Sequence, residues 1–294
     1  ALAGLNARHG GRNDAMAWQG HLRLHYRREG ERTVGHDRHD GPLRVLRSLH
    51  PEGPQTCHHV LVHPPGGIVG GDRLEVDVEL AADAHALITT PGATRFYRSA
   101  GDTALQTVDA RVAANARLEW LPLETIAYRG TRASNRMRFA LAPGAQMIGW
   151  DMLALGLPAA GEAFDAGRYE QSIELPGAWL DRGIVDAGQP WCGRLLDGPL
   201  GWDGQRALAT MWCAFGGEWP AAVRDALLDE ARCAIEASPV AARAGASAPT
   251  AGLVVLRALA ARVEPLWELL QAVRHAWRER LWGMAPSTPR GWRT

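Results

Sequence analysis

The chain has 294 residues, of which 46% are hydrophobic, so it can bury a sizeable core in one large domain or two smaller ones. Its 32 basic residues, all of them arginine, balance 32 acidic residues, and the formal net charge is zero. A neutral chain has no overall attraction to nucleic acid or to an anionic membrane, so we expect a globular protein that binds neither.

The cysteines and the start of the chain indicate a cellular location. Cys57, Cys192, Cys213 and Cys233 form no Cys-x-x-Cys pair, which predicts free thiols and neither a zinc ribbon nor a redox site. Residues 1–14 contain no apolar signal-peptide core, and no run reaches the roughly 18 apolar residues of a membrane span. We therefore predict a cytoplasmic protein.

Residues 18–185 show mostly strand patterns. Leu22, Leu24 and Tyr26 alternate with polar residues, which is the period of a half-buried strand. Similar short runs recur at 43–49, 58–63, 84–90, 105–112 and 117–121. Proline and glycine turn signals separate them, so we predict a mainly β fold built as stacked antiparallel sheets or as a solenoid-like body.

The pattern changes after Pro190. Apolar residues recur at helical spacing over 223–235 and again over 266–281, where Gly283 marks the end of the second helix. A strand is predicted between them at 253–259. We expect a single domain over 1–294, β-rich at 18–190 and mixed at 191–294, with about two helices in its last third.

The segment His63–Asp72 (HPPGGIVGGD) is the most unusual of the chain. Glycine reaches positive φ without steric cost and proline fixes φ, so Gly66, Gly67, Gly70 and Gly71 predict a shaped structural loop. A Walker loop requires a lysine, which the chain lacks, and the glycines do not have dinucleotide-fingerprint spacing. The alternation of apolar and polar residues over 74–80 predicts a strand directly after the loop, so we expect no helix N-terminus there that could bind a phosphate.

Three histidines near this loop suggest a metal, but their spacing argues against a joint site. His59 and His63 share one face of a strand about 13 Å apart, and His58 points to the other face. Ordinary, partly buried histidines are the preferred interpretation.

Three acidic residues interrupt apolar or glycine-rich surroundings: Asp72, Asp151 and Glu162. A buried carboxylate without a partner is costly, so each one pairs with an arginine, caps backbone donors or lines a wet cavity. Pairing or capping is the more common arrangement. No Gly-x-Ser-x-Gly or His-Glu-x-x-His motif is present, and we predict no catalytic residues.

Tryptophan and arginine dominate the hot spots of protein interfaces, and the second predicted helix carries both types. We therefore predict a partner interface at Trp277, Arg278 and Trp282. The alternative is that this stripe packs on the sheet, which is favoured for Trp277 more than for Trp282.

The motifs themselves are similar to those of one known family. They are His63–Asp72, Leu87–Ser99, Leu118–Pro122 with Glu124 and Ile126, Trp150–Asp151, Leu155–Gly156, Gly161–Phe164 and Pro289–Thr294. In this order they resemble the urease accessory protein UreD, also called UreH, over nearly the whole chain. Two positions depart from the family pattern, with Gly291 in place of an aliphatic residue and Leu123 in place of a glutamine.

This resemblance implies a non-enzymatic, β-rich scaffold that binds apo-urease and a UreF-type protein, which recruits a UreG-type GTPase. It implies no tightly bound cofactor, with nickel only in transit. A metal in transit must be held weakly by a few oxygen ligands and water. We therefore predict that Asp72, Asp151 and Glu162, matched to acidic positions of the family motifs, face an internal water-filled tunnel.

Two alternatives come from other classes. A metal-dependent hydrolase would use Asp72, Asp151 and Glu162 together with a histidine. A carbohydrate-binding sandwich would expose a groove of tryptophans, whereas Trp18, Trp120 and Trp150 lie in apolar runs that predict core positions.

Overall fold

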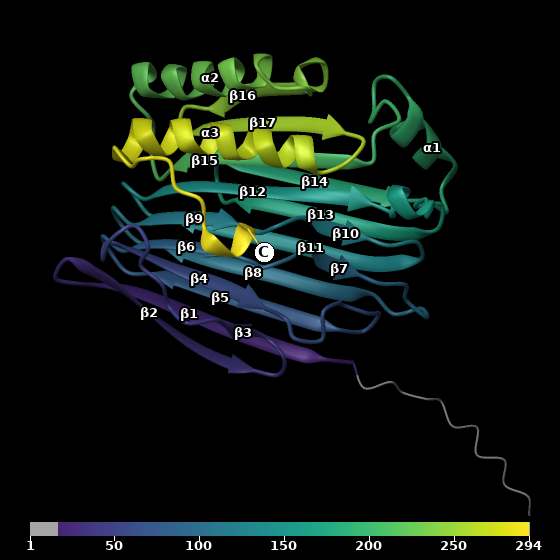
Figure 1. The fold of residues 1–294 in the computed structure, drawn as a ribbon, viewed down its shortest axis with the longest axis horizontal. Helices are drawn as coiled ribbons and strands as arrows, with labels where there is room; N and C mark the ends of the chain where they lie inside the picture. The colour runs from purple at the N-terminus through teal and green to yellow at the C-terminus, as the bar shows by residue number, and fades with distance from the viewer. Residues whose placement is uncertain (1–16, 294) are drawn as a thin grey trace, which may run out of the picture.

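The computed structural model describes residues 17–293 and consists of two stacked β-sheets, with two of its three helices together on one side and the third apart from them (Figure 1). The seven-stranded sheet has the order β14 (Trp179–Asp186), β13 (Gly167–Leu175), β11 (Thr131–Leu141), β8 (Ala104–Val112), β5 (Arg73–Leu80), β1 (Gln19–Glu29) and β2 (Arg32–Asp40).

The ten-stranded sheet has the order β16 (Ala244–Thr250), β17 (Leu253–Ala260), β15 (Ala207–Phe215), β12 (Gln146–Leu155), β9 (Arg117–Leu121), β6 (His85–Thr89), β4 (Thr56–Val62) and β3 (Arg44–Val45). Two short strands, β10 (Thr125–Ala127) and β7 (Thr94–Phe96), extend it beside β12. The helices are α1 (Pro190–Asp197), α2 (Ala221–Glu236) and α3 (Glu264–Trp282), with short 3₁₀ turns at Pro158–Ala160, Ala241–Arg243 and Arg290–Arg293.

The central strands form a solenoid-like body. From β4 to β13 the longer strands lie alternately in the ten-stranded and the seven-stranded sheet, so neighbours within a sheet are one coil apart and pair in parallel. Antiparallel pairing is confined to the ends, as in β1–β2, β13–β14, β12–β15 and β15–β17. The mainly β prediction is confirmed, and of its two forms the solenoid-like one describes the centre.

The two sheets differ in whether their outer faces are covered, and the hydrophobic patterns of their strands reflect this difference. One apolar cluster fills the space between the sheets, and a second lies between the ten-stranded sheet and α2 and α3. Strands β6 and β9 are therefore covered on both faces and read as continuous buried runs. Strand β5 has one face in water, and its buried residues Leu74, Val76, Val78 and Leu80 alternate with polar ones.

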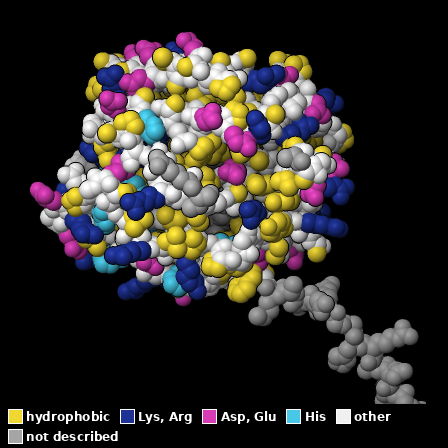
Figure 2. Space-filling view, viewed as in Figure 1, with side chains coloured by type: hydrophobic (Ala, Val, Ile, Leu, Met, Phe, Trp, Pro, Cys, Tyr) yellow, Lys and Arg dark blue, Asp and Glu magenta, His cyan; other side chains and the backbone are white. Residues whose placement is uncertain are grey.

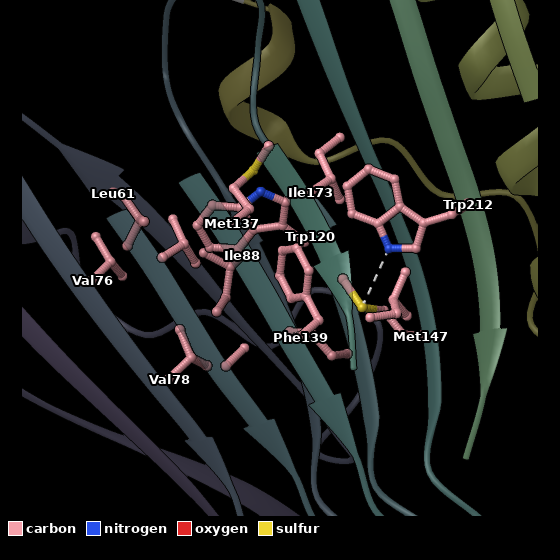
Figure 3. Close-up of a cluster of buried hydrophobic side chains, with 14 of the residues drawn as sticks. Leu61, Val76, Val78, Ile88, Trp120, Met137, Phe139, Met147, Ile173 and Trp212 are labelled. Carbon is pink, nitrogen blue, oxygen red and sulfur yellow. Dashed lines mark hydrogen bonds between the residues drawn. The ribbon is translucent and has the colours of Figure 1, made fainter. Parts of the chain in front are cut away.

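Figure 3 shows part of the cluster between the sheets. The labelled side chains are Leu61, Val76, Val78, Ile88, Trp120, Met137, Phe139, Met147, Ile173 and Trp212. The indole of Trp212 donates a hydrogen bond to the sulfur of Met147 at 3.4 Å, so this aromatic group keeps a polar partner inside the core.

The helices confirm two of the predicted elements. Helices α2 and α3 occupy the predicted positions, and α3 ends at Gly283, which adopts φ 59° in the left-handed region. Helix α1 was not predicted. Within residues 17–293, no helix combines the length and the apolar character that a membrane span requires. On the face shown in Figure 2, acidic and basic side chains are interspersed.

Candidate functional site

A cavity of about 370 Å³ lies between the two sheets at the end that carries the glycine-rich loop. Its polar lining groups are His63, Thr90, Thr94, Arg95, Gln106, Thr125, Asn135 and Asp151. Its apolar wall comes from both sheets, including Val76, Val108, Trp120 and Met137. Exposed residues of the loops 63–67 and 90–95 form one end, so the cavity opens toward solvent there.

Asp151 is the carboxylate that faces this cavity. It follows Trp150 on β12, and neighbouring residues of a strand point to opposite faces, so Trp150 packs toward the helices and Asp151 points between the sheets. Its Oδ2 accepts a hydrogen bond from Gln171 Nε2 at 2.7 Å. Burial raises the pKa of Asp151 from 3.8 to about 6, with Asp181 adding to the rise and the Gln171 bond opposing it.

His63 lies at the open end of the cavity. Its Nε2 is buried and makes no hydrogen bond within the described part of the chain. Burial lowers the pKa of His63, while the charge of Asp72 opposes that change. A neutral imidazole nitrogen without a partner therefore stands near the mouth, and Asp151 lies further inside.

The glycine-rich loop adopts the restricted backbone conformation that its composition predicts. Gly66 and Gly71 have φ values of 79° and 92°, which other residues rarely adopt. A Cβ on Gly67 would lie 1.9 Å from Cε2 of Tyr97. A Cβ on Gly70 would lie 2.1 Å from the hydroxyl of Ser99 and 2.7 Å from the carbonyl oxygen of Asp102. The loop wall of the cavity is thus packed against the segment 97–102.

Replacing Gly70 with alanine is expected to destabilise the protein by about 1–3 kcal/mol, because the new methyl group overlaps a backbone carbonyl. The matched control is Gly92→Ala in the facing loop, where a Cβ meets nothing within 4 Å. Urea unfolding of both variants measures the difference, and equal stabilities would contradict tight packing of the loop at Gly70.

The structure does not bring the three predicted acids together. Both oxygens of Asp72 cap the loop, accepting bonds from the backbone N–H of Trp18 at 2.8 Å and of Val69 at 2.9 Å. Glu162 is exposed beside a 3₁₀ turn. The prediction that all three line one tunnel is therefore wrong for Asp72 and Glu162, because one stabilises backbone donors and the other lies in water.

A buried ionic cluster, which the sequence patterns did not predict, lies between α3 and the sheet. Glu119 on β9 is fully buried and lies 2.8 Å from Arg274 Nη2 and 3.2 Å from Arg278 Nε, both fully buried on α3. Burial raises the pKa of Glu119, but Arg274, His85 and Arg278 together bring it far below its ordinary value. The sequence feature that could have indicated this cluster is the acidic Glu119 inside the apolar run 118–121, together with Arg274 and Arg278, which are four residues apart on the helical stripe.

Two histidines and a second carboxylate extend this cluster. The carboxylate of Glu52 lies between Arg278 and His58, with Oε2 2.5 Å from Arg278 Nη2 and Oε1 2.8 Å from His58 Nε2. His85 Nε2 lies 3.1 Å from Glu119 Oε1. His58 is therefore engaged with a carboxylate. His59 is held elsewhere, between the Tyr26 hydroxyl at 2.7 Å and Ser48 at 2.6 Å. Within residues 17–293, no three His, Cys, Asp or Glu side chains converge as metal ligands.

The predicted partner interface on α3 is wrong for the two buried residues Trp277 and Arg278, and it stays a prediction for Trp282, which is partly exposed. Trp277 and Arg278 are fully buried, and the indole N–H of Trp277 donates to the carbonyl of Leu227 at 2.8 Å. Trp282 donates to the side chain of Gln146 and packs edge-on against His85. The stripe packs inward because it carries the charges that neutralise Glu119. In contrast, Trp18 was predicted as core and is 51% exposed.

The C-terminal segment crosses the ten-stranded sheet. It leaves α3 and ends beside β6 and β9 (Figure 1), where Trp292 donates to the Thr89 hydroxyl at 2.7 Å and packs against Trp150 and Trp267. Arg274 Nη1 donates to the carbonyl of Ser287 at 2.7 Å. Trp150 thus connects this tail to the strand that carries Asp151.

Comparison with known proteins agrees with these motifs. The family model of the UreD urease accessory proteins matches residues 19–293. The chain belongs to the UreD family. The UreD protein of Leptothrix cholodnii is 61% identical over 281 residues, covering 95% of this chain and 100% of the relative. UreD proteins of Methylibium petroleiphilum and Variovorax paradoxus are 56% and 54% identical, each over 95% of this chain and 100% of the relative.

The resemblance inferred from the motifs is therefore confirmed, and it extends across the entire described fold. UreD proteins are accessory factors, so this chain is not an enzyme. The hydrolase alternative also lacks support from geometry, because Asp72, Asp151 and Glu162 occupy three separate environments.

Proposed function

We propose that this UreD protein serves urease maturation as the scaffold of a nickel-delivery complex, and that nickel crosses the cavity between its two sheets. Membership of the UreD family supports the role in urease maturation. In this proposal the protein forms a complex with UreF-type and UreG-type proteins, docks on apo-urease and works in the cytoplasm. The nickel ion is cargo and not a resident cofactor.

The cavity and its carboxylate carry this proposal. Its lining offers one buried acid, Asp151, and one imidazole nitrogen without a hydrogen-bond partner, His63. A cation that meets one ligand at a time, with water filling the remaining positions, is held weakly and can move on. A closed set of thiolates and imidazoles would trap it, and the cavity lining contains no cysteine.

Filling the cavity tests passage directly. Val108 lines the cavity from β8 and is 3% exposed. Val108→Phe is expected to reduce urease activation strongly when co-expressed with urease and its other accessory proteins, because the ring occupies the route. Val108→Ala enlarges the same cavity and is the matched control, so it should keep activation provided the protein remains folded.

Two further measurements make the result decisive. Co-purification with urease and the UreF-type protein should be unchanged for Val108→Phe, and its melting temperature should not fall below that of Val108→Ala. Full activation by a folded Val108→Phe protein would refute passage through this cavity. Loss of co-purification by both variants would instead assign the cavity wall to assembly.

A further inference from the structure

Two unpaired histidines face each other on the open side of the seven-stranded sheet. His25 on β1 and His36 on β2 are direct partners in the antiparallel ladder. Directly opposed residues have Cβ atoms about 4.5–5.5 Å apart and point to the same face. Both side chains are exposed, on the hairpin that forms the lower edge of the stack in Figure 1.

These two imidazoles are also free. Among the histidines of residues 17–293, His25 and His36 are exposed and make no hydrogen bond or ion pair. Their neighbours are engaged, since His21 lies 2.7 Å from Asp77 and His39 lies 3.8 Å from Asp37. The ring nitrogens of His25 and His36 therefore remain available for an external ligand.

A carboxylate continues the row onto a third strand. Glu79 on β5 is the parallel partner of His25, and it is exposed while Val78 and Leu80 on either side are buried. Its Oε1 lies 3.0 Å from Arg111 Nη1, with both side chains more than half exposed. An exposed ion pair of this kind is weak, so Glu79 can exchange Arg111 for another cation.

We propose that His25 and His36 bind one divalent transition-metal ion of the class that prefers imidazole, such as Ni²⁺, Zn²⁺ or Cu²⁺, with Glu79 as a third ligand. Imidazole nitrogen is a good ligand for these ions, whereas Mg²⁺ and Ca²⁺ prefer oxygen. Within residues 17–293 no three such side chains already converge, so Glu79 joins the two histidines as a ligand only after the exposed side chains rotate to other rotamers. Water fills the remaining positions.

This site is separate from the cavity. The residues of β5 that line the cavity, Leu74 and Val76, point between the sheets, whereas Glu79 points to the outer face. The sheet itself lies between the two places. The hairpin site therefore holds whether or not nickel crosses the cavity.

Isothermal titration of the full chain with NiCl₂, and separately with ZnCl₂, tests this site. We expect His25→Ala and His36→Ala each to weaken binding about tenfold or more, because each removes one of two pre-positioned ligands. His39→Ala is the matched control and should bind as the wild type does. Although it is on the same strand, its ladder partner is Leu22, so it points to the opposite face.

Two readouts distinguish loss of a metal ligand from loss of folding. The electron paramagnetic resonance spectrum of bound Cu²⁺ should show two nitrogen ligands in the wild type and one in either alanine variant. Melting temperatures should be unchanged, since His36 is exposed on an edge strand. Equal affinity of the wild type and both variants would overturn the proposal. Neither readout involves urease, so failure here is distinct from failure of the proposed delivery role.

Discussion

Asp151→Asn is expected to stabilise the protein while reducing its ability to activate urease. Burial holds the pKa of Asp151 at about 6, so at pH 7.5 the folded protein keeps an ionised carboxylate in a place that disfavours its charge. Asparagine removes the charge and can still accept the bond from Gln171. The gain should be on the order of 1–3 kcal/mol in the free energy of unfolding, measured with urea.

The pH dependence identifies the cause. The unfolded carboxyl releases its proton near pH 3.8 and the folded one at about 6, so the native state binds more protons between these values. Wild-type stability therefore falls as pH rises through this window, relative to the asparagine variant. The stabilisation should vanish below about pH 4 and be complete above about pH 7. A difference that does not depend on pH would show that the charge of Asp151 is not its source.

Asp72→Asn is the matched control for this experiment. Both carboxylate oxygens of Asp72 accept backbone hydrogen bonds, and an amide group can replace only one of them as acceptor. This variant should lose about 1–3 kcal/mol. Opposite signs for the two variants would show that Asp151, unlike Asp72, is kept at a cost in stability, which is typical of functional residues.

Glu119→Gln is expected to destabilise the protein by about 3–5 kcal/mol, because it leaves the buried Arg274 and Arg278 without their shared counter-charge. Chemical denaturation at neutral pH measures this loss. The control is Asp165→Asn, which breaks an exposed pair with Arg129 and should change stability by less than about 1 kcal/mol. Similar small losses in both variants would show that the buried cluster does not hold α3 on the sheet.

The same cluster predicts acid sensitivity. The folded-state pKa of Glu119 lies below the ordinary value of 4.5, so its contribution is fully present above that pH. It is lost as the pH falls toward the folded-state value, when the proton breaks the contact with Arg274. The protection of α3 amides against hydrogen exchange, taken relative to the intrinsic exchange rate at each pH, should therefore fall at low pH more in the wild type than in Glu119→Gln.

Much of the fold follows from local patterns. Alternation over 74–80 predicts a strand with one face in water, and the helical spacing over 266–281 with Gly283 predicts α3 and its end. The glycine spacing of 63–72 likewise predicts a rigid loop before a strand. Each of these depends on backbone preferences and side-chain periodicity within a few residues, so the chain itself contains the information.

Only part of the candidate site can be predicted from local sequence patterns. An acid in an apolar or glycine-rich run is the same local pattern at Asp72, Asp151 and Glu119. Their different fates depend on neighbours distant in the chain, since Asp72 meets the backbone of Trp18 and Glu119 meets Arg274, 155 positions away. Periodicity places Trp277 and Arg278 on one stripe without saying whether that stripe meets water or a buried carboxylate.

The family, the mainly β class, the late helices and the shape of the glycine-rich loop could all be predicted from the amino-acid sequence. The parallel pairing of the central strands, the position of Asp151 in the cavity lining and the burial of the α3 arginines could not. Strand pairing and the burial of charge depend on contacts between segments far apart in the chain, and local preferences do not encode those contacts.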